Sequence, residues 1–341
     1  MEGIRSILIF LFASLGSSQP LYSQTSLGVF ESLNWTEIRP AAIQTETVMA
    51  DEPAGRPIIN PELKEVWITG RQYLWQWNLD DGAMSRWDQP AGKFESFKLI
   101  HATKSILIGI DSRAAWMLNL KQKTWLKLDG SFPPNCLPTS AYPLPSDESH
   151  RIYFANKCGI FLILTDPGQL VATSGSEWKL SPDNPQTFSE GPGSNRILTA
   201  REKNLLQVTL DGPRLSDRIV YNAKSRIKGT ARSGDQILAW TAQAMIVFDE
   251  KLRRRQVIPV LGTRKIQALG ASATTHIVAF TDGTLEVMNI PSHRKWASSR
   301  SDYLPQFIDI LANDSLVVLS SESGMPRVFS LPAGNGVTPP R

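Results

Sequence analysis

Short apolar runs recur along this chain at a nearly constant spacing. Each run is followed by turn residues, and then by a stretch in which every second residue is apolar, as in Trp75, Trp77 and Leu79. Alternation with period two predicts β-strands with one buried face. No long stretch keeps a helical period, so the pattern predicts an all-β protein. The runs begin near Val66, Leu107, Ile152, Ile197, Ile237, Ile277 and Leu316.

The spacing of these runs, about 40 to 45 residues, is typical of β-propeller blades with four strands each. An outer strand is expected about 18 to 26 residues after each start, by the same four-strand layout. We therefore predict a seven-bladed propeller over residues 28–331, built from four-stranded antiparallel blades. The outer position is held by Trp87, Trp125, Trp178 and Trp296, and by Ile219 and Val257 in two further units.

The seventh unit lacks an outer strand of its own before the Pro- and Gly-rich end of the chain. Residues 33–38 carry the outer-strand pattern, Trp35 included, ahead of the first unit. We predict that this N-terminal strand joins the last blade and closes the ring, which would remove the open sheet edges. Residues 332–341 are predicted to form a flexible tail.

The layout resembles the seven-bladed propellers of the WD40-like and quinoprotein-like type. The resemblance rests on period and strand pattern across residues 28–331. The Gly-His and Trp-Asp dipeptides of WD40 repeats are missing, apart from the isolated Trp87-Asp88, and the quinoprotein blade motifs are also missing. The resemblance therefore implies an architecture and names no specific family.

The first residues have the character of a secretory signal. A weakly basic start precedes the apolar run Ile7–Leu15, which is too short to span a bilayer. We predict a signal peptide over residues 1–23, cut near Ser23, with a cut after Gly16 or an uncleaved anchor as alternatives. The protein would then be periplasmic or secreted, and no later run is long enough to cross a membrane.

The chain has two cysteines, Cys136 and Cys158. In an oxidising compartment an even pair usually forms a disulfide, so we predict a bond between them that pins a surface loop. Two thiols without clustered histidines make a poor metal site, and a redox role is not expected without a CxxC motif.

A search for catalytic signatures predicts no catalytic residue, no metal site and no cofactor. Of the four histidines, His101 is expected near the central channel, and His150 and His276 are expected in loops; the fourth is His293. There is no GxSxG elbow and no phosphate-binding loop, and the paired carboxylates fall at predicted turns. The recurring tryptophans are expected to pack between blades rather than to bind glycans.

Charge is distributed unevenly. The whole chain holds 36 Lys and Arg against 32 Asp and Glu, whereas residues 195–300 hold 18 against 8. Such basic regions attract anionic partners, although they can also be simple solvated loops. Candidate binding residues form two groups: a first basic cluster of Lys224, Arg226 and Lys228, and a second basic cluster of Lys251, Arg253, Arg254 and Arg255.

Propeller folds carry many functions, so three hypotheses stay open. The first is a non-catalytic scaffold, a monomer in the bacterial periplasm or cell envelope, that binds a protein partner, which could be acidic. The second is a binder of carbohydrate or of an anionic envelope polymer or lipid. The third is an enzyme, a hydrolase, lyase or oxidoreductase, acting at the channel mouth. Nucleic acid is not an expected partner, because no recognition motif is present.

Overall fold

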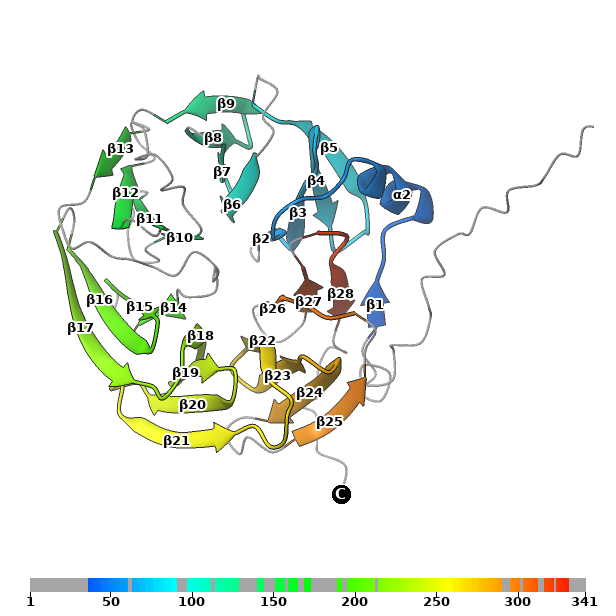
Figure 1. Ribbon diagram of the computed structural model, residues 1–341. Helices are drawn as coiled ribbons and strands as arrows, with labels where there is room; N and C mark the ends of the chain where they lie inside the picture. The colour runs from blue at the N-terminus through cyan, green and yellow to red at the C-terminus, as the bar shows by residue number, and fades with distance from the viewer. Residues whose placement is uncertain are drawn as a thin grey trace, which may run out of the picture.

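The computed structural model is an all-β protein with one short helix in its described part (Figure 1). The strands form seven four-stranded sheets, and every pairing within them is antiparallel. The described residues are 36–60, 63–90, 97–111, 114–128, 140–143, 151–156, 159–164, 169–172, 189–191, 195–211, 214–289, 295–300, 303–311, 316–321 and 323–330.

In the first four sheets the strands are hydrogen-bonded in chain order. The first sheet consists of β2 (Ile58–Asn60), β3 (Glu65–Thr69), β4 (Tyr73–Asn78) and β5 (Met84–Asp88). The second consists of β6 (Lys98–Ala102), β7 (Ile106–Ile110), β8 (Ala115–Asn119) and β9 (Thr124–Lys127). The third consists of β10 (Ser140–Pro143), β11 (Arg151–Asn156), β12 (Gly159–Leu164) and β13 (Gln169–Ala172). The fourth consists of β14 (Ser189–Glu190), β15 (Arg196–Arg201), β16 (Asn204–Asp211) and β17 (Arg214–Asn222).

The fifth and sixth sheets repeat this order, and the seventh departs from it. The fifth sheet consists of β18 (Ile227–Ser233), β19 (Gln236–Thr241), β20 (Ala244–Asp249) and β21 (Arg254–Pro259). The sixth consists of β22 (Ile266–Ala271), β23 (Thr275–Phe280), β24 (Thr284–Asn289) and β25 (Lys295–Arg300). The seventh consists of β26 (Phe307–Ile310), β27 (Leu316–Ser320), β28 (Arg327–Ser330) and the N-terminal β1 (Thr36–Ile38).

The repeat predicted from the apolar runs is the repeat of the sheets. Every predicted run lies in the second strand of its sheet, from Val66 in β3 to Leu316 in β27. The second strands are the most apolar because both of their faces are covered: all five residues of β3 and of β27 are buried. The predicted outer position also falls in the fourth strand of the first, second, fourth, fifth and sixth sheets, as Trp87 does in β5. The predicted outer position of the third unit, Trp178, lies outside the described residues.

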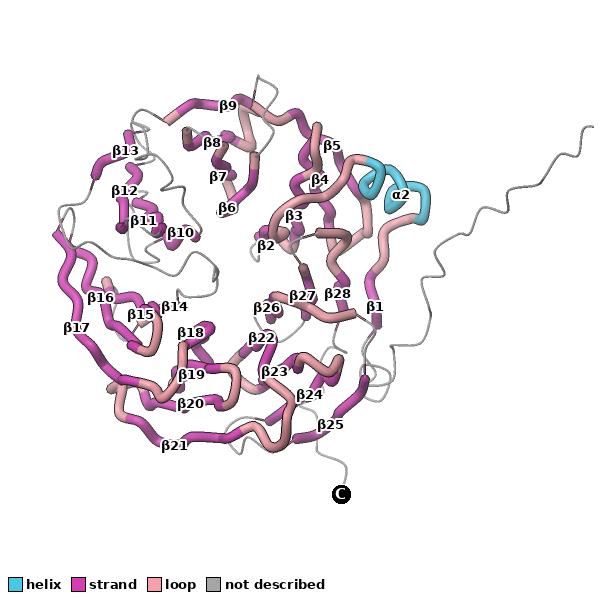
Figure 2. Tube along the Cα trace, in the orientation of Figure 1, coloured by secondary structure: helices cyan, strands magenta, loops and turns pink. Residues whose placement is uncertain are grey.

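The sheets stand side by side around a common centre, with the first strand of each innermost and the fourth outermost (Figures 1 and 2). Innermost strands contact the next sheet in turn: β2 with β6, β6 with β10, β14 with β18, β18 with β22, and β22 with β26. The arrangement is propeller-like.

The N-terminal segment bridges the seventh and first sheets. Strand β1 pairs with β28, with Glu37 opposite Phe329, so part of the predicted strand 33–38 forms the outer strand of the last sheet. The side chain of Glu37 also accepts a hydrogen bond from Arg327 Nε at 2.8 Å. An apolar cluster that includes Val66 of β3 and Val318 of β27 packs the two sheets together.

Helix α2 (Ala42–Ala50) follows β1 and was not predicted from the sequence. It buries only Val48, so it lacks the apolar stripe that would reveal it. Just after it, Asp51 reaches into the turn between β3 and β4. Its carboxylate accepts hydrogen bonds from the backbone N–H groups of Gln72 and Tyr73 and from the indole of Trp75.

The tryptophans of the first and second sheets serve as core, as predicted. Trp67 and Trp77 are fully buried, and so is Trp240 in the fifth sheet. Trp87 and Trp125 are partly buried, and their indoles donate to Gln76 Oε1 and to the carbonyl of Asp88. The same outer position in the fourth and fifth sheets is exposed, at Ile219 and Val257.

Several sequence predictions lie outside the described residues. These are the signal peptide (1–23), the tail (332–341), the disulfide between Cys136 and Cys158, and the packing of Trp178. Trp296 is placed in β25, but its side chain is also outside the description. Within the part of the chain that the structure describes, no helix is long and apolar enough to span a membrane.

Candidate functional site

The structure places the two basic clusters at opposite ends of the fifth sheet. Lys224 and Arg226 lie in the connection between β17 and β18, and Lys228 is the second residue of β18. The second cluster lies where β20 turns into β21. Because the four antiparallel strands alternate in direction, these two connections cannot be at the same end of the sheet. The seven residues therefore form two separate surfaces.

The first basic cluster gains a fourth cation from the sixth sheet. Lys228 Nζ donates a hydrogen bond to the carbonyl of Ile266 at 2.8 Å, which brings it beside Lys265. Burial lowers the pKa of Lys228, and the positive charges of Lys265 and Arg226 lower it further. Lys224 and Lys265 are both exposed. Cations that repel one another in this way would be stabilised by a bound anion.

The loops that carry the first basic cluster are tied together by backbone hydrogen bonds. At this end of the sheets, Ile227 N–H donates to the carbonyl of Glu202 at 2.7 Å, and Ile266 N–H donates to that of Ala242 at 2.8 Å. Thr281 N–H donates to the carbonyl of Lys265 at 2.9 Å. Loops of three neighbouring sheets thus hold the four cations on a fixed frame.

The second basic cluster is largely neutralised within itself. Asp249 Oδ2 lies 2.9 Å from Arg253 Nε and 2.8 Å from Arg255 Nη2. Although desolvation acts against it, the hydrogen bonds from Arg253 and the charges of Arg253 and Arg255 lower the pKa of Asp249. Arg254 is stacked over the ring of Tyr221, 5.8 Å from its centroid. These contacts hold the β20–β21 turn, and Lys251 joins them through its backbone N–H, which donates to Asp249 Oδ1 at 3.0 Å.

The histidine predictions are partly corrected. His101 lies in β6, the innermost strand of the second sheet, as expected for a residue near the centre. Its Nε2 atom is buried without a hydrogen-bond partner, and burial lowers the pKa of His101 to about 4. His276 was expected in a loop, but it is fully buried in β23, because the strand begins at Thr275, two residues before its apolar run. His150 and His293 are outside the described residues.

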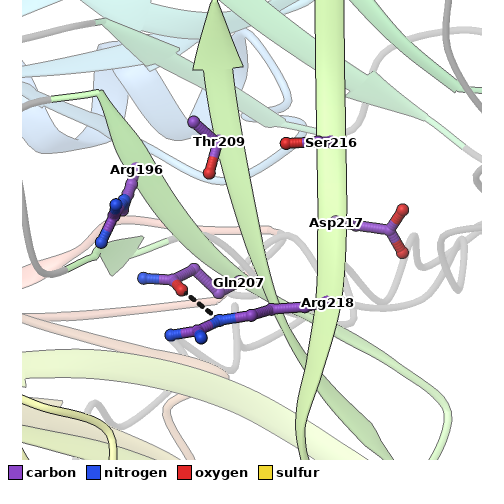
Figure 3. Close-up of a pocket in the computed structure, with 6 residues that line it drawn as sticks. All are labelled: Arg196, Gln207, Thr209, Ser216, Asp217 and Arg218. Atoms are coloured by element: carbon purple, nitrogen blue, oxygen red, sulfur yellow. Dashed lines mark hydrogen bonds between the residues drawn. The ribbon is translucent and has the colours of Figure 1, made fainter.

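A polar hollow that the sequence did not reveal lies on the fourth sheet (Figure 3). It measures about 210 Å³ and is lined by Arg196, Gln207, Thr209, Ser216, Asp217 and Arg218. The strand register explains this gathering. Arg196, Thr209 and Ser216 are direct partners across three strands, and Gln207 and Arg218 are partners in the next row on the same face.

The side chains in the hollow leave several hydrogen-bond donors in one place. Arg218 Nε donates to Gln207 Oε1 at 2.7 Å, as the dashed line in Figure 3 shows, so the terminal nitrogens of Arg218 remain. Gln207 is 3% exposed, and its Nε2 has no hydrogen-bond partner. Arg196 points from the other side toward this amide, whereas the Asp217 carboxylate points away.

The sequence alone did not predict this hollow. The β16 segment was read for its apolar alternation, Leu206 and Val208, and both are fully buried. The polar residues between them, Gln207 and Thr209, belong to the opposite face. Their partners, Arg196 and Arg218, come from other strands, and only the register shows that all four meet.

Comparison of the chain with protein-family models gives no match, and comparison with curated proteins gives none either. Among the described residues, no group of three or more His, Cys, Asp or Glu side chains is arranged to hold a metal ion. The two basic clusters and the hollow are therefore the candidate sites that the described residues offer.

Proposed function

We propose that this chain is an exported, non-catalytic scaffold, a seven-bladed β-propeller that binds an acidic protein partner. The observation that carries the proposal is the first basic cluster, joined by Lys265, where cations of two sheets repel one another on a rigid frame. Rigid surfaces lose little entropy on binding, and clustered positive charge steers an anionic partner toward the site.

Closure of the ring is part of this proposal. The pairing of β1 with β28 supports it, as does an ion pair between Arg56 and Asp309 at 2.6 Å, which links the segment before β2 to β26. A closed ring covers the faces of every sheet and leaves only short, protected strand edges, so its loops can differ without loss of the core. The WD40-like or quinoprotein-like character proposed from the blade period belongs to the same hypothesis.

Within this proposal the partner docks at the end of the sheets that carries Lys224 and Lys265. The second basic cluster is the weaker candidate, because Asp249 already pairs with Arg253 and Arg255. The carbohydrate alternative loses its main support, since the tryptophans with described side chains are buried or partly buried in the core.

The proposal is tested by crosslinking the tagged full-length protein in its native envelope fraction and identifying the products by mass spectrometry. The double variant Lys224→Glu and Lys265→Glu reverses two exposed charges of the site. The matched control, Lys121→Glu and Lys127→Glu, reverses two exposed charges on the second sheet, outside both basic clusters. A specific acidic partner should be recovered with the wild type and the control, and at least about tenfold less with the first variant.

Two results would contradict the proposal. One is a partner recovered equally with both double variants, which would move the interface to another surface. The other is the absence of any enriched protein from the envelope fraction. Export itself is checked separately, by fractionating cells and determining the N-terminal residue of the mature chain.

A further inference from the structure

We propose that the hollow on the fourth sheet is a binding site for a small oxyanion, a phosphate or a carboxylate group. This inference goes beyond the proposed scaffold function and does not depend on it. The hollow lies where β15 begins, whereas Lys203 in the β15–β16 turn is at the end that carries the first basic cluster. The two sites are therefore at opposite ends of their sheets.

The donor set matches an oxyanion in both charge and geometry. Two guanidinium groups, from Arg196 and Arg218, supply positive charge and several N–H donors. Thr209 and Ser216, direct partners on β16 and β17, add two hydroxyl groups on the same face. Planar guanidinium groups favour carboxylate and phosphate because two N–H donors can engage two oxygens together.

The Gln207 amide is the strongest sign that this is a site rather than a solvated surface. Its Oε1 is occupied by Arg218, which fixes the direction of the amide, and its buried Nε2 has no acceptor. A buried N–H group without a partner is unfavourable, and an incoming oxygen that accepts from it would remove that cost. The Arg196 side chain is exposed, so it can rotate outward to admit the ligand.

Little negative charge near the hollow would compete with a bound anion for the two arginines. In the described part of the structure, no carboxylate forms an ion pair with Arg196 or Arg218. Asp217 lines the rim, but its carboxylate is turned away from both arginines (Figure 3). Beneath the hollow, the fully buried Leu198 lies on the same face as Arg196 and anchors the row to the core between the fourth and fifth sheets.

The test is calorimetric titration of the purified full chain with inorganic phosphate and, separately, with citrate, at constant ionic strength maintained with sodium chloride. We expect saturable binding of at least one anion. Tighter binding of phosphate would identify a phosphate site, and tighter binding of citrate would identify a carboxylate site. If neither anion saturates the protein below about 50 mM, the proposal is overturned.

Variants locate the binding. Gln207→Glu is isosteric and keeps the acceptor for Arg218 Nε, but it replaces the free donor with a negative charge. It should weaken binding at least about tenfold, and the exposed Arg196→Gln should weaken it in the same direction. The control, Arg201→Gln, removes the same charge from the other end of β15 and should change affinity by less than about twofold.

Equal effects of Gln207→Glu and Arg201→Gln would show that the protein attracts anions only through its overall charge, and would overturn the assignment. A comparison of thermal unfolding for each variant confirms that the fold is retained. The variant Lys224→Glu and Lys265→Glu should bind the anion as the wild type does, so failure of the scaffold proposal and failure of this one give different results.

Discussion

The first and second sheets build the same turn with carboxylates from different parts of the chain. In the second sheet Asp111 directly follows β7, and its carboxylate accepts hydrogen bonds from the Ala114 N–H and the Trp116 indole, both at 2.7 Å. In the first sheet the equivalent residue is Gly70. The missing carboxylate is supplied by Asp51, about twenty residues earlier, which accepts from the Trp75 indole at 2.8 Å.

The replacement is close in space as well as in chemistry. A Cβ atom added to Gly70 would lie 2.0 Å from Asp51 Oδ2, so the remote carboxylate occupies the volume that a local side chain would need. The hydrogen bonds from this turn to a carboxylate therefore serve different purposes in the two sheets. In the second sheet they only shape a turn, whereas in the first sheet they also fasten the N-terminal segment across the junction with the seventh sheet.

The largest effect is expected for Asp51→Ala. The substitution leaves two backbone N–H groups and the Trp75 indole without their acceptor, and it releases the segment that carries β1. We expect the free energy of unfolding to fall by about 3 kcal/mol, measured by denaturant titration. The neighbouring Glu52→Ala removes an exposed ion pair with Arg71 and should cost less than about 0.5 kcal/mol. Equal losses in the two variants would refute the bridging role of Asp51.

A carboxylate introduced at position 70 should be able to replace the carboxylate of Asp51. Gly70→Asp in the wild type clashes with Asp51 and should destabilise the protein by about 2 kcal/mol. Combined with Asp51→Gly, the same substitution should restore at least about half of what Asp51→Gly alone loses. Thermal unfolding of the wild type, the two single variants and the double variant measures the coupling energy between positions 51 and 70. Additive losses would mean that the two turns are not equivalent.

Asp111→Ala should cost less than Asp51→Ala, about 1–2 kcal/mol, because it removes the same kind of hydrogen bond without freeing a distant segment. The measurement is again denaturant titration. Susceptibility to proteolysis near the N-terminus separates the two cases: it should increase with Asp51→Ala and stay unchanged with Asp111→Ala.

The smallest effect is expected for the pH dependence of stability, which depends on a residue of the innermost strand of the second sheet. His101 of β6 pairs with Ile108, the middle residue of β7. The equivalent residue of the first sheet is Ile58 of β2, which pairs with Trp67, the middle residue of β3. Burial lowers the pKa of folded His101 to about 4, whereas the unfolded chain binds the proton near the ordinary pKa of 6.5. Stability should therefore decrease as pH falls from 6.5 toward 4, by about 1 kcal/mol between pH 7 and 5.5.

The substitution His101→Ile places at this position the residue that the first sheet has. It should remove this part of the pH dependence of the unfolding free energy. Unfolding free energies at several pH values between 7 and 5 measure it. An unchanged slope in the variant would show that another group titrates in this range.

Much of the fold was predictable because blade repeats leave a periodic trace in the sequence. The second strand of each sheet is covered on both faces, so it appears as an apolar run, and every run that begins near Val66 through Leu316 lies in such a strand. The N-terminal strand was predicted for a similar reason, and its residues Thr36–Ile38 pair with β28. Helix α2 was missed because a helix that buries only Val48 has no apolar period to detect.

The candidate sites were less predictable because they depend on which strands become neighbours. Counting charge identified the two basic clusters but could not show that Asp249 neutralises one of them while Lys265 adds to the other. The hollow on the fourth sheet was invisible for the same reason, since its residues are ordinary polar positions on three separate strands.

The all-β character, the repeat of about 40 to 45 residues, the apolar second strands and the excess of positive charge over residues 195–300 were all predictable from the order of the amino acids. These are properties of local composition and alternation, and hydrophobic burial makes them detectable along one dimension. Two features became visible only in three dimensions: Asp51 takes the place of a side chain at Gly70, and Gln207 lies beside two arginines. Strand register and sheet packing bring such residues together, and neither leaves a mark in the order of the amino acids.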